Sequence, residues 1–261
     1  MNVTTAFLLG LIQGLTEFLP VSSSGHLELA KIIFDTDSLA KESLLFTLIL
    51  HGATALSTLV VFRKDIRSLF IDLFKFTKNE SFYFACYIVF SMIPATLVGL
   101  FLEDLITSLF FKNNALVGAM LLLTGGLLFL ADRAKATTKN INSKSAILIG
   151  IMQAVAILPG ISRSGATIAT AVLLGVDKEK AARFSFLMVI PLIFGSMAKS
   201  ILDADSVVLQ ENTTTLIVGF VSAFFVGVIA CKWMIDIVKK AQLRYFSWYC
   251  FAVGIIAIFI L

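Results

Sequence analysis

The sequence predicts an all-α polytopic membrane protein, with six transmembrane helices and two re-entrant helical hairpins arranged in an inverted-topology repeat. Three observations predict this fold: the apolar composition, two apolar regions broken by proline, and the uneven distribution of basic residues. Of the 261 residues, 58% are hydrophobic and 15% are charged, whereas soluble domains are usually near half apolar and a quarter charged. Because long apolar runs cover the whole length, residues 1–261 are expected to form a single membrane domain.

Six continuous apolar stretches have close to the roughly 17–25 residues that a spanning helix needs. They cover residues 44–62, 82–102, 115–131, 184–202, 214–232 and 245–261. We place repeat one at residues 1–131 and repeat two at residues 146–261, joined by a cytoplasmic linker at residues 132–145.

Two further apolar regions, residues 5–33 and 146–175, are interrupted near their centres. A proline followed by serines and a glycine occupies residues 20–25, and a similar run occupies residues 159–165. Each half of these regions gives roughly 20 Å of helix at about 1.5 Å per residue, which is too short for a hydrocarbon core of about 30 Å. We therefore expect each region to be a re-entrant hairpin.

The basic residues support this topology. Most of the 21 lysines and arginines lie in four loops, at residues 63–78, 133–144, 178–183 and 232–244. By the positive-inside rule these loops belong on the cytoplasmic face. The six spans place all four loops there only if residues 5–33 and residues 146–175 each return to the face from which they entered.

The two hairpins also repeat one another at a constant offset of 140 residues. The matching pairs are Gly10 with Gly150, Gln13 with Gln153, Ser22 with Ser162, Ser24 with Ser164, and Gly25 with Gly165. Since one copy enters from each face, the repeats have inverted topology. Broken helices at corresponding positions of two halves indicate a binding site near the middle of the membrane.

The broken helices favour an anion as the ligand. A half-helix that starts at a serine-rich turn presents free N–H groups and the positive end of its dipole. Two such N-termini meeting near the midplane would suit a diphosphate, which carries two anionic groups.

The repeats differ where chemistry would need them to differ. Glu17, Ser23 and His26 in the first hairpin correspond to Ile157, Arg163 and Ala166 in the second. Ionisable residues inside a membrane are costly and mark functional sites by default. Glu17 and Arg163 are the charges that cannot reach an interface, and a purely structural ion pair between the hairpins is the alternative interpretation.

Other polar residues have simpler interpretations. Gln13 lies four residues before Glu17, on the same helix face. His26 and His51 are the two histidines, which excludes a histidine-rich metal site. We interpret His51 as a packed or cavity-edge residue. The aromatic residues Trp233, Tyr245, Trp248 and Tyr249 are interpreted as interfacial anchors.

Two motifs resemble a known family. Residues 13–26 resemble the first signature of bacterial undecaprenyl-diphosphate phosphatases of the bacitracin-resistance type, and residues 158–167 resemble the second. The stretch Phe184-Ser185-Phe186-Leu187 with Ile190-Pro191 is similar to a third, and the resemblance covers the whole chain. Gln13 stands where the family also allows glutamate, which leaves Glu17 as the carboxylate of that pair.

The resemblance implies hydrolysis of undecaprenyl diphosphate to undecaprenyl phosphate and inorganic phosphate, which recycles the carrier lipid for cell-wall synthesis and confers bacitracin resistance. It implies a divalent cation, Mg²⁺ or Ca²⁺, and we assign Glu17, together with Gln13, as the contact of that cation. It also implies a multi-pass protein of the bacterial inner membrane, with its site open to the outer face. The expected partners are a polyprenyl diphosphate lipid and the bilayer, without nucleic acid, and the sequence leaves a homodimer open.

We assign roles as hypotheses. Ser23 is the nucleophile, Glu17 or His26 accepts its proton, and Arg163 clamps both phosphates. The expected substrate-binding residues are Gln13, Ser22, Ser24, Gly25, Ser162, Ser164 and Gly165. Attack by an activated water, with Ser23 only a phosphate ligand, remains open. The rival function is a lipid-carrier flippase or secondary transporter, and a channel ranks third.

Overall fold

The computed structural model describes residues 1–34, 40–74, 79–110, 113–135, 137–203, 213–240 and 242–259, and these residues form twelve α-helices. Within them the chain contains no β-strand, only one isolated bridge between Lys139 and Val176. The predicted all-α class is therefore confirmed.

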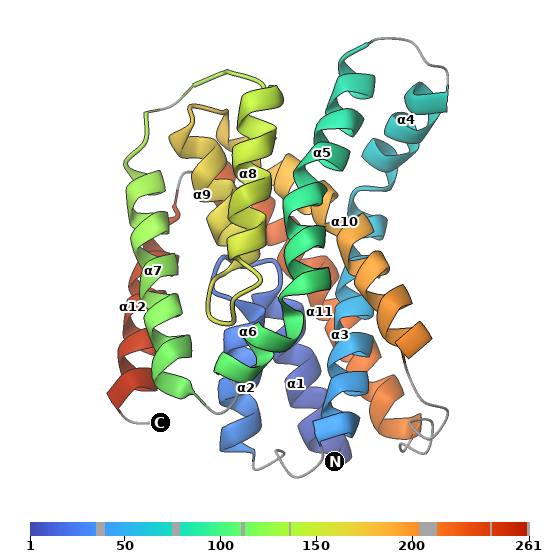
Figure 1. The fold of residues 1–261 in the computed structure, drawn as a ribbon, viewed down its shortest axis with the longest axis vertical. Coiled ribbons are helices and arrows are strands. Elements are labelled where there is room, and N and C mark those ends of the chain that lie inside the picture. Colours follow the sequence, from blue (N-terminus) through green and yellow to red (C-terminus); the bar gives the residue numbers. More distant parts are fainter. Residues whose placement is uncertain are drawn as a thin grey trace.

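Both predicted hairpins break where the sequence indicates. The first consists of α1 (Val3–Thr16) and α2 (Ser23–Ile33), and the second of α8 (Ser143–Val155) and α9 (Arg163–Leu173). In Figure 1, α1 and α2 lie at the end of the molecule that carries the N-terminus, whereas α8 and α9 lie at the opposite end. The two breaks meet between them, near the middle of the long axis.

The backbone at the breaks explains why the helices stop. Pro20 and Pro159 have no N–H to continue a helical hydrogen-bond ladder. Ser22 adopts a left-handed conformation with φ of 72°, and Gly160 adopts one with φ of 96°. A left-handed residue ends a right-handed helix, and only glycine adopts it without steric cost. Ser22 is therefore a strained position directly before α2.

Six longer helices coincide with the six predicted spans. They are α3 (Ala40–Val61), α5 (Glu80–Phe101), α7 (Asn114–Asp132), α10 (Lys178–Asp203), α11 (Thr213–Lys239) and α12 (Arg244–Phe259). Among the described residues, α5, α7 and α11 are long and apolar enough to cross a membrane, and α3 with α4 forms a fourth candidate bent by 78°. A polytopic helical membrane protein fits these helices, while the count of six spans stays a prediction.

Two short helices were not predicted. Helix α4 (Arg63–Phe74) lies where we expected a basic loop, and α6 (Glu103–Phe110) follows α5. Helix α4 carries basic residues together with exposed apolar side chains such as Phe70 and Phe74. That combination is typical of a helix lying in the membrane interface, and a search for long apolar runs overlooks it.

The two halves of the chain pack reciprocally. Helix α1 packs on α11, and α8, its repeat counterpart, packs on α5. Small residues permit this close approach. A Cβ on Gly10 would lie 2.6 Å from the Gly219 carbonyl oxygen, and a Cβ on the matching Gly150 would lie 2.5 Å from that of Ser91. The repeated glycines thus bring each first half-helix against a long helix of the other half.

Candidate active site

The breaks of the two hairpins touch one another. The Ser164 hydroxyl of the second hairpin donates a hydrogen bond to the Leu19 carbonyl of the first, at 3.4 Å. Gly25 and Gly160 also lie against each other, because a Cβ on Gly25 would be 3.1 Å from the Gly160 Cα. The structure therefore places the two serine-rich turns in direct contact.

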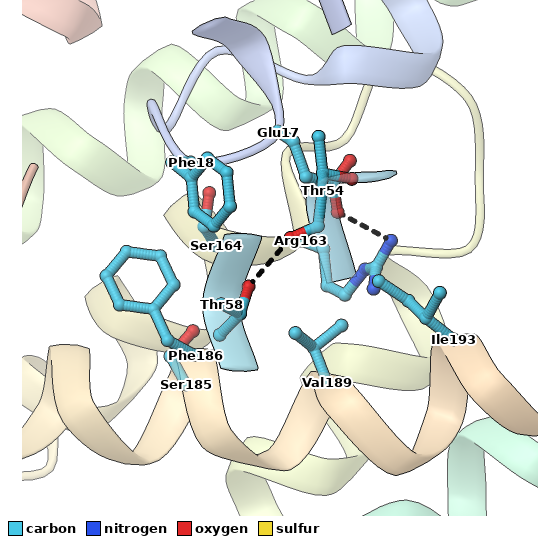
Figure 2. A pocket seen from close by; sticks show the side chains of 10 residues that line it. All are labelled: Glu17, Phe18, Thr54, Thr58, Arg163, Ser164, Ser185, Phe186, Val189 and Ile193. Atoms are coloured by element: carbon cyan, nitrogen blue, oxygen red, sulfur yellow. Dashed lines mark hydrogen bonds and ion pairs between the residues drawn. The ribbon is translucent and has the colours of Figure 1, made fainter. Parts of the chain in front are cut away.

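Glu17 and Arg163 form an ion pair across this contact. Arg163 Nη2 lies 3.3 Å from Glu17 Oε1, and the Glu17 side chain is 8% exposed while that of Arg163 is 25% exposed. Figure 2 shows the two side chains pointing toward one another beside Thr54 of α3. Because a buried charge is costly unless it is paired, each of these residues stabilises the other in the centre of the protein.

The second carboxylate oxygen of Glu17 accepts two hydrogen bonds. Ser23 Oγ donates to Glu17 Oε2 at 2.7 Å, and Gln13 Nε2 donates to the same oxygen at 3.0 Å. His51 Nε2 lies 3.8 Å from it. A hydroxyl within hydrogen-bond reach of a carboxylate has the geometry of a nucleophile and its general base.

Each half-helix that follows a break begins with a serine cap. In α9, Ser162 Oγ accepts a hydrogen bond from the Gly165 N–H at 3.0 Å, and in α2, Ser22 Oγ accepts one from the Gly25 N–H at 3.3 Å. The hydroxyls two positions apart also contact each other, Ser22 with Ser24 at 3.4 Å and Ser162 with Ser164 at 3.3 Å. All seven predicted substrate-binding residues except Gln13 thus belong to two equivalent helix N-termini, which favour anions.

A small cavity of about 20 Å³ lies beside the ion pair. Its polar lining comes from Glu17, Thr54, Thr58, Arg163, Ser164 and Ser185. A cavity of this size holds about one water molecule.

The structure directs His26 away from the Ser23–Glu17 pair. His26 Nδ1 lies 2.8 Å from the Ser22 carbonyl oxygen, and Nε2 lies 2.9 Å from the Tyr249 hydroxyl. The imidazole also stacks on the Tyr249 ring, with centroids 5.5 Å apart and planes inclined by 11°. Both ring nitrogens therefore have partners other than the predicted nucleophile.

Comparison with known proteins identifies the family. A family model described as "Bacitracin resistance protein BacA" matches residues 6–256. The chain belongs to the bacitracin resistance protein family. The resemblance predicted from the motifs at residues 13–26 and 158–167 is thereby confirmed.

Three curated relatives of this family member are named undecaprenyl-diphosphatase. The protein of Christiangramia forsetii is 56% identical over 258 residues, covering 99% of this chain and 98% of the relative. That of Bacteroides fragilis is 49% identical over 260 residues, covering 97% and 96%. That of Bacteroides thetaiotaomicron is 47% identical over 262 residues, covering 99% and 98%. The similarity extends over essentially the whole of each protein.

Sequence analysis missed part of the site in this bacitracin resistance family member. His51, which we interpret as a packed or cavity-edge residue, lies on α3 beside Glu17, and this position agrees with a cavity-edge residue. Its contact with Glu17 was not predicted. The spacing of His51, Thr54 and Thr58 places them on one polar face of an apolar helix, a signal that could have found them. Tyr249, which we interpreted as an interfacial anchor, contacts His26. No local sequence pattern predicts the contact between Tyr249 and His26.

The donor set next to Glu17 fits a hard divalent cation. Gln13 is fully buried, and its Oε1 has no hydrogen-bond partner although its Nε2 is bonded to Glu17. If the amide turned so that Oε1 rather than Nε2 faced Glu17, Gln13 and Glu17 would offer two oxygen ligands, which Mg²⁺ and Ca²⁺ prefer. The described residues contain no cluster of three or more His, Cys, Asp or Glu side chains that could hold a metal. A cation bound here would depend on substrate phosphates for further ligands, as Mg²⁺ sites commonly do.

Proposed function

We propose that this protein hydrolyses undecaprenyl diphosphate to undecaprenyl phosphate and inorganic phosphate, and so recycles the carrier lipid for cell-wall synthesis and confers bacitracin resistance. Three full-length relatives carry the name undecaprenyl-diphosphatase. The single observation that carries the proposal is the Ser23 hydroxyl, 2.7 Å from a carboxylate that is itself paired with Arg163. These residues supply a nucleophile, a base and a phosphate-binding cation in one place.

The first step is attack of Ser23 Oγ on the terminal phosphorus. The bond from that phosphorus to the bridging oxygen breaks, and undecaprenyl phosphate leaves. The hydroxyl proton passes to Glu17 Oε2, which already accepts its hydrogen bond. In the second step water attacks the phosphorus of the phosphoserine and the bond from phosphorus to Ser23 Oγ breaks. Ser23 Oγ takes back the proton that Glu17 accepted, and inorganic phosphate leaves with the protons of the attacking water. The contacts support Glu17, rather than His26, as the base for Ser23, because both nitrogens of His26 have other partners. We assign His26 the second role in the proton transfers, that of a general acid or of a relay that passes a proton to water.

Arg163 stabilises the charge that accumulates on the phosphates. Its guanidinium is planar and permanently charged, so it can hold two oxygens at once. It is the first residue of α9, where the N–H groups of the half-helix also point toward the break. Phosphoryl transfer depends mostly on such positioning and charge stabilisation.

A divalent cation, Mg²⁺ or Ca²⁺, completes the proposal. Glu17 and Gln13 would hold it, and when bound it would neutralise charge on the diphosphate. The expected consequence is that a chelator abolishes phosphate release and that added Mg²⁺ or Ca²⁺ restores it.

The protein is proposed to act in the bacterial inner membrane. Helices α3, α5, α7, α10, α11 and α12 would cross it, and both hairpins would return to the face they enter, with the site open to the outer face. The basic loops support this orientation, since they share one face in that threading. The exposed apolar surface of α5 supports the embedding.

Phosphate release from undecaprenyl diphosphate by the purified protein in detergent tests the function. A flippase or secondary transporter, the rival function for paired broken helices, would release none. Release that continues in the Ser23→Ala and Glu17→Gln variants at the wild-type rate would contradict the proposal.

A further inference from the structure

Tyr249 lies outside every motif in the sequence, yet it contacts one of the four residues assigned to catalysis. It belongs to α12, and its hydroxyl reaches His26 Nε2 across 223 positions of the chain. The neighbouring Cys250 contacts the same hairpin, with its Sγ 3.7 Å from the Pro20 carbonyl oxygen. Helix α12 is thus anchored against the first break by two consecutive residues.

The hydrogen bonds of His26 define its tautomer. The Ser22 carbonyl oxygen can only accept, so the Nδ1 atom 2.8 Å away has to carry a hydrogen. In the neutral imidazole Nε2 is then the acceptor, and the Tyr249 hydroxyl donates to it at 2.9 Å. The Nε2 lone pair of His26 therefore accepts the hydrogen bond from Tyr249.

The backbone reinforces this arrangement. Ser22 is the one non-glycine residue with positive φ in the part of the chain that the structure describes. In this conformation its carbonyl accepts from the His26 backbone N–H at 3.1 Å as well as from the imidazole. A strained backbone conformation persists only where several contacts fix it. Here the Ser22 carbonyl accepts two hydrogen bonds from His26, and the other ring nitrogen of His26 is bonded to Tyr249.

We propose that Tyr249 is a positioning residue of the hydrolysis reaction, which fixes the orientation and tautomer of the His26 imidazole through its hydroxyl. The inference rests on the proposed function, and it concerns the hydroxyl rather than the ring. Stacking alone would be retained by phenylalanine, whereas the hydrogen bond to Nε2 would be lost. An imidazole with a hydrogen bond on each nitrogen keeps one orientation and one tautomer throughout the reaction.

The test compares Tyr249→Phe with Tyr245→Phe. Tyr245 lies one turn earlier on α12 and is 58% exposed, which makes it a matched control. We expect Tyr249→Phe to lower kcat by about tenfold with KM nearly unchanged, because the hydrogen bond that orients the proposed proton relay at His26 is lost. Tyr245→Phe is expected to match the wild type.

A spectroscopic readout separates positioning from a structural role. The chain has two histidines, so ¹⁵N-histidine labelling gives two imidazoles, and His51→Gln assigns them. We expect Nδ1 of His26 to be protonated in both proteins, and its Nε2 signal to move toward that of an unbonded nitrogen in Tyr249→Phe alone.

Three results would overturn the inference: an unchanged Nε2 signal in Tyr249→Phe, a protonated Nε2 with bare Nδ1 in the wild type, or equal kcat for the two tyrosine variants. The NMR result does not depend on turnover. A wild-type protein that releases no phosphate would instead refute the proposed function.

Discussion

The substitution Glu17→Gln tests the role of the carboxylate at almost constant size. The amide can still accept a hydrogen bond from Ser23, which lies 2.7 Å away in the wild type, but it cannot take the proton. General-base catalysis contributes about 10²–10⁴-fold. We therefore expect kcat to fall by about 10³-fold, which corresponds to about 4 kcal/mol of activation free energy.

The same substitution removes the counter-charge of Arg163. Breaking a fully buried pair costs about 3–5 kcal/mol, but the Arg163 side chain is 25% exposed and reaches some solvent. We expect a loss of about 2 kcal/mol in the free energy of unfolding, which leaves the protein folded. Thermal unfolding in detergent checks this loss separately from the rate.

The assay is phosphate release from undecaprenyl diphosphate at saturating substrate, with Glu28→Gln as the control. Glu28 is an exposed carboxylate on α2, and its variant is expected to keep wild-type kcat. Because a base acts in the chemical step, the loss of the base is measured in kcat. KM is expected to rise as well, since Glu17 is also a proposed contact of the cation. A Glu17→Gln protein that is folded and retains more than about a tenth of wild-type kcat would refute Glu17 as the base, since general-base loss is larger than that.

Three further predictions concern other contacts. Arg163→Lys keeps the charge but loses the planar fork, and we expect kcat to fall by about 10²-fold; near-normal phosphate release in that variant would refute the clamp. Gly10→Ala should cost about 2 kcal/mol of stability, because its Cβ would lie 2.6 Å from the Gly219 carbonyl oxygen. Its control is Gly126→Ala, where a Cβ meets nothing within 4 Å, and equal melting temperatures for the two variants would contradict the packing argument. Asp65→Asn breaks the solvent-accessible ion pair with Arg183 between α4 and α10. We expect it to lower the free energy of unfolding by less than about 1 kcal/mol, and a larger loss in thermal unfolding would contradict this expectation.

Local chemistry made the hairpins predictable. Proline, serine and glycine at residues 20–25 and 159–165 stop a helix and start another, whatever packs around them. The pairing of Glu17 with Arg163 was also expected, because two charges that cannot reach an interface have to satisfy each other. These features depend on a few neighbouring residues or on one strong physical requirement.

The orientation of His26 could not be predicted in the same way. His26 follows Ser23 by three residues, and this spacing predicts that both side chains lie on one face of α2, with His26 near the nucleophile. Its actual partner, Tyr249, is 223 residues away in the chain, and the choice depends on how α12 packs. Helix α4 was missed for another reason, since its residues form an amphipathic pattern of basic and apolar side chains and not a long apolar run.

Trapping the covalent intermediate tests the central claim most directly. The protein is mixed with undecaprenyl diphosphate labelled on its terminal phosphate, quenched in acid within a turnover, and the peptide containing Ser22, Ser23 and Ser24 is sequenced by mass spectrometry. We predict phosphate on Ser23 alone, and no labelled peptide from Ser23→Ala. Full phosphate release with an unlabelled Ser23, and sustained turnover in Ser23→Ala, would show that water attacks the lipid diphosphate directly.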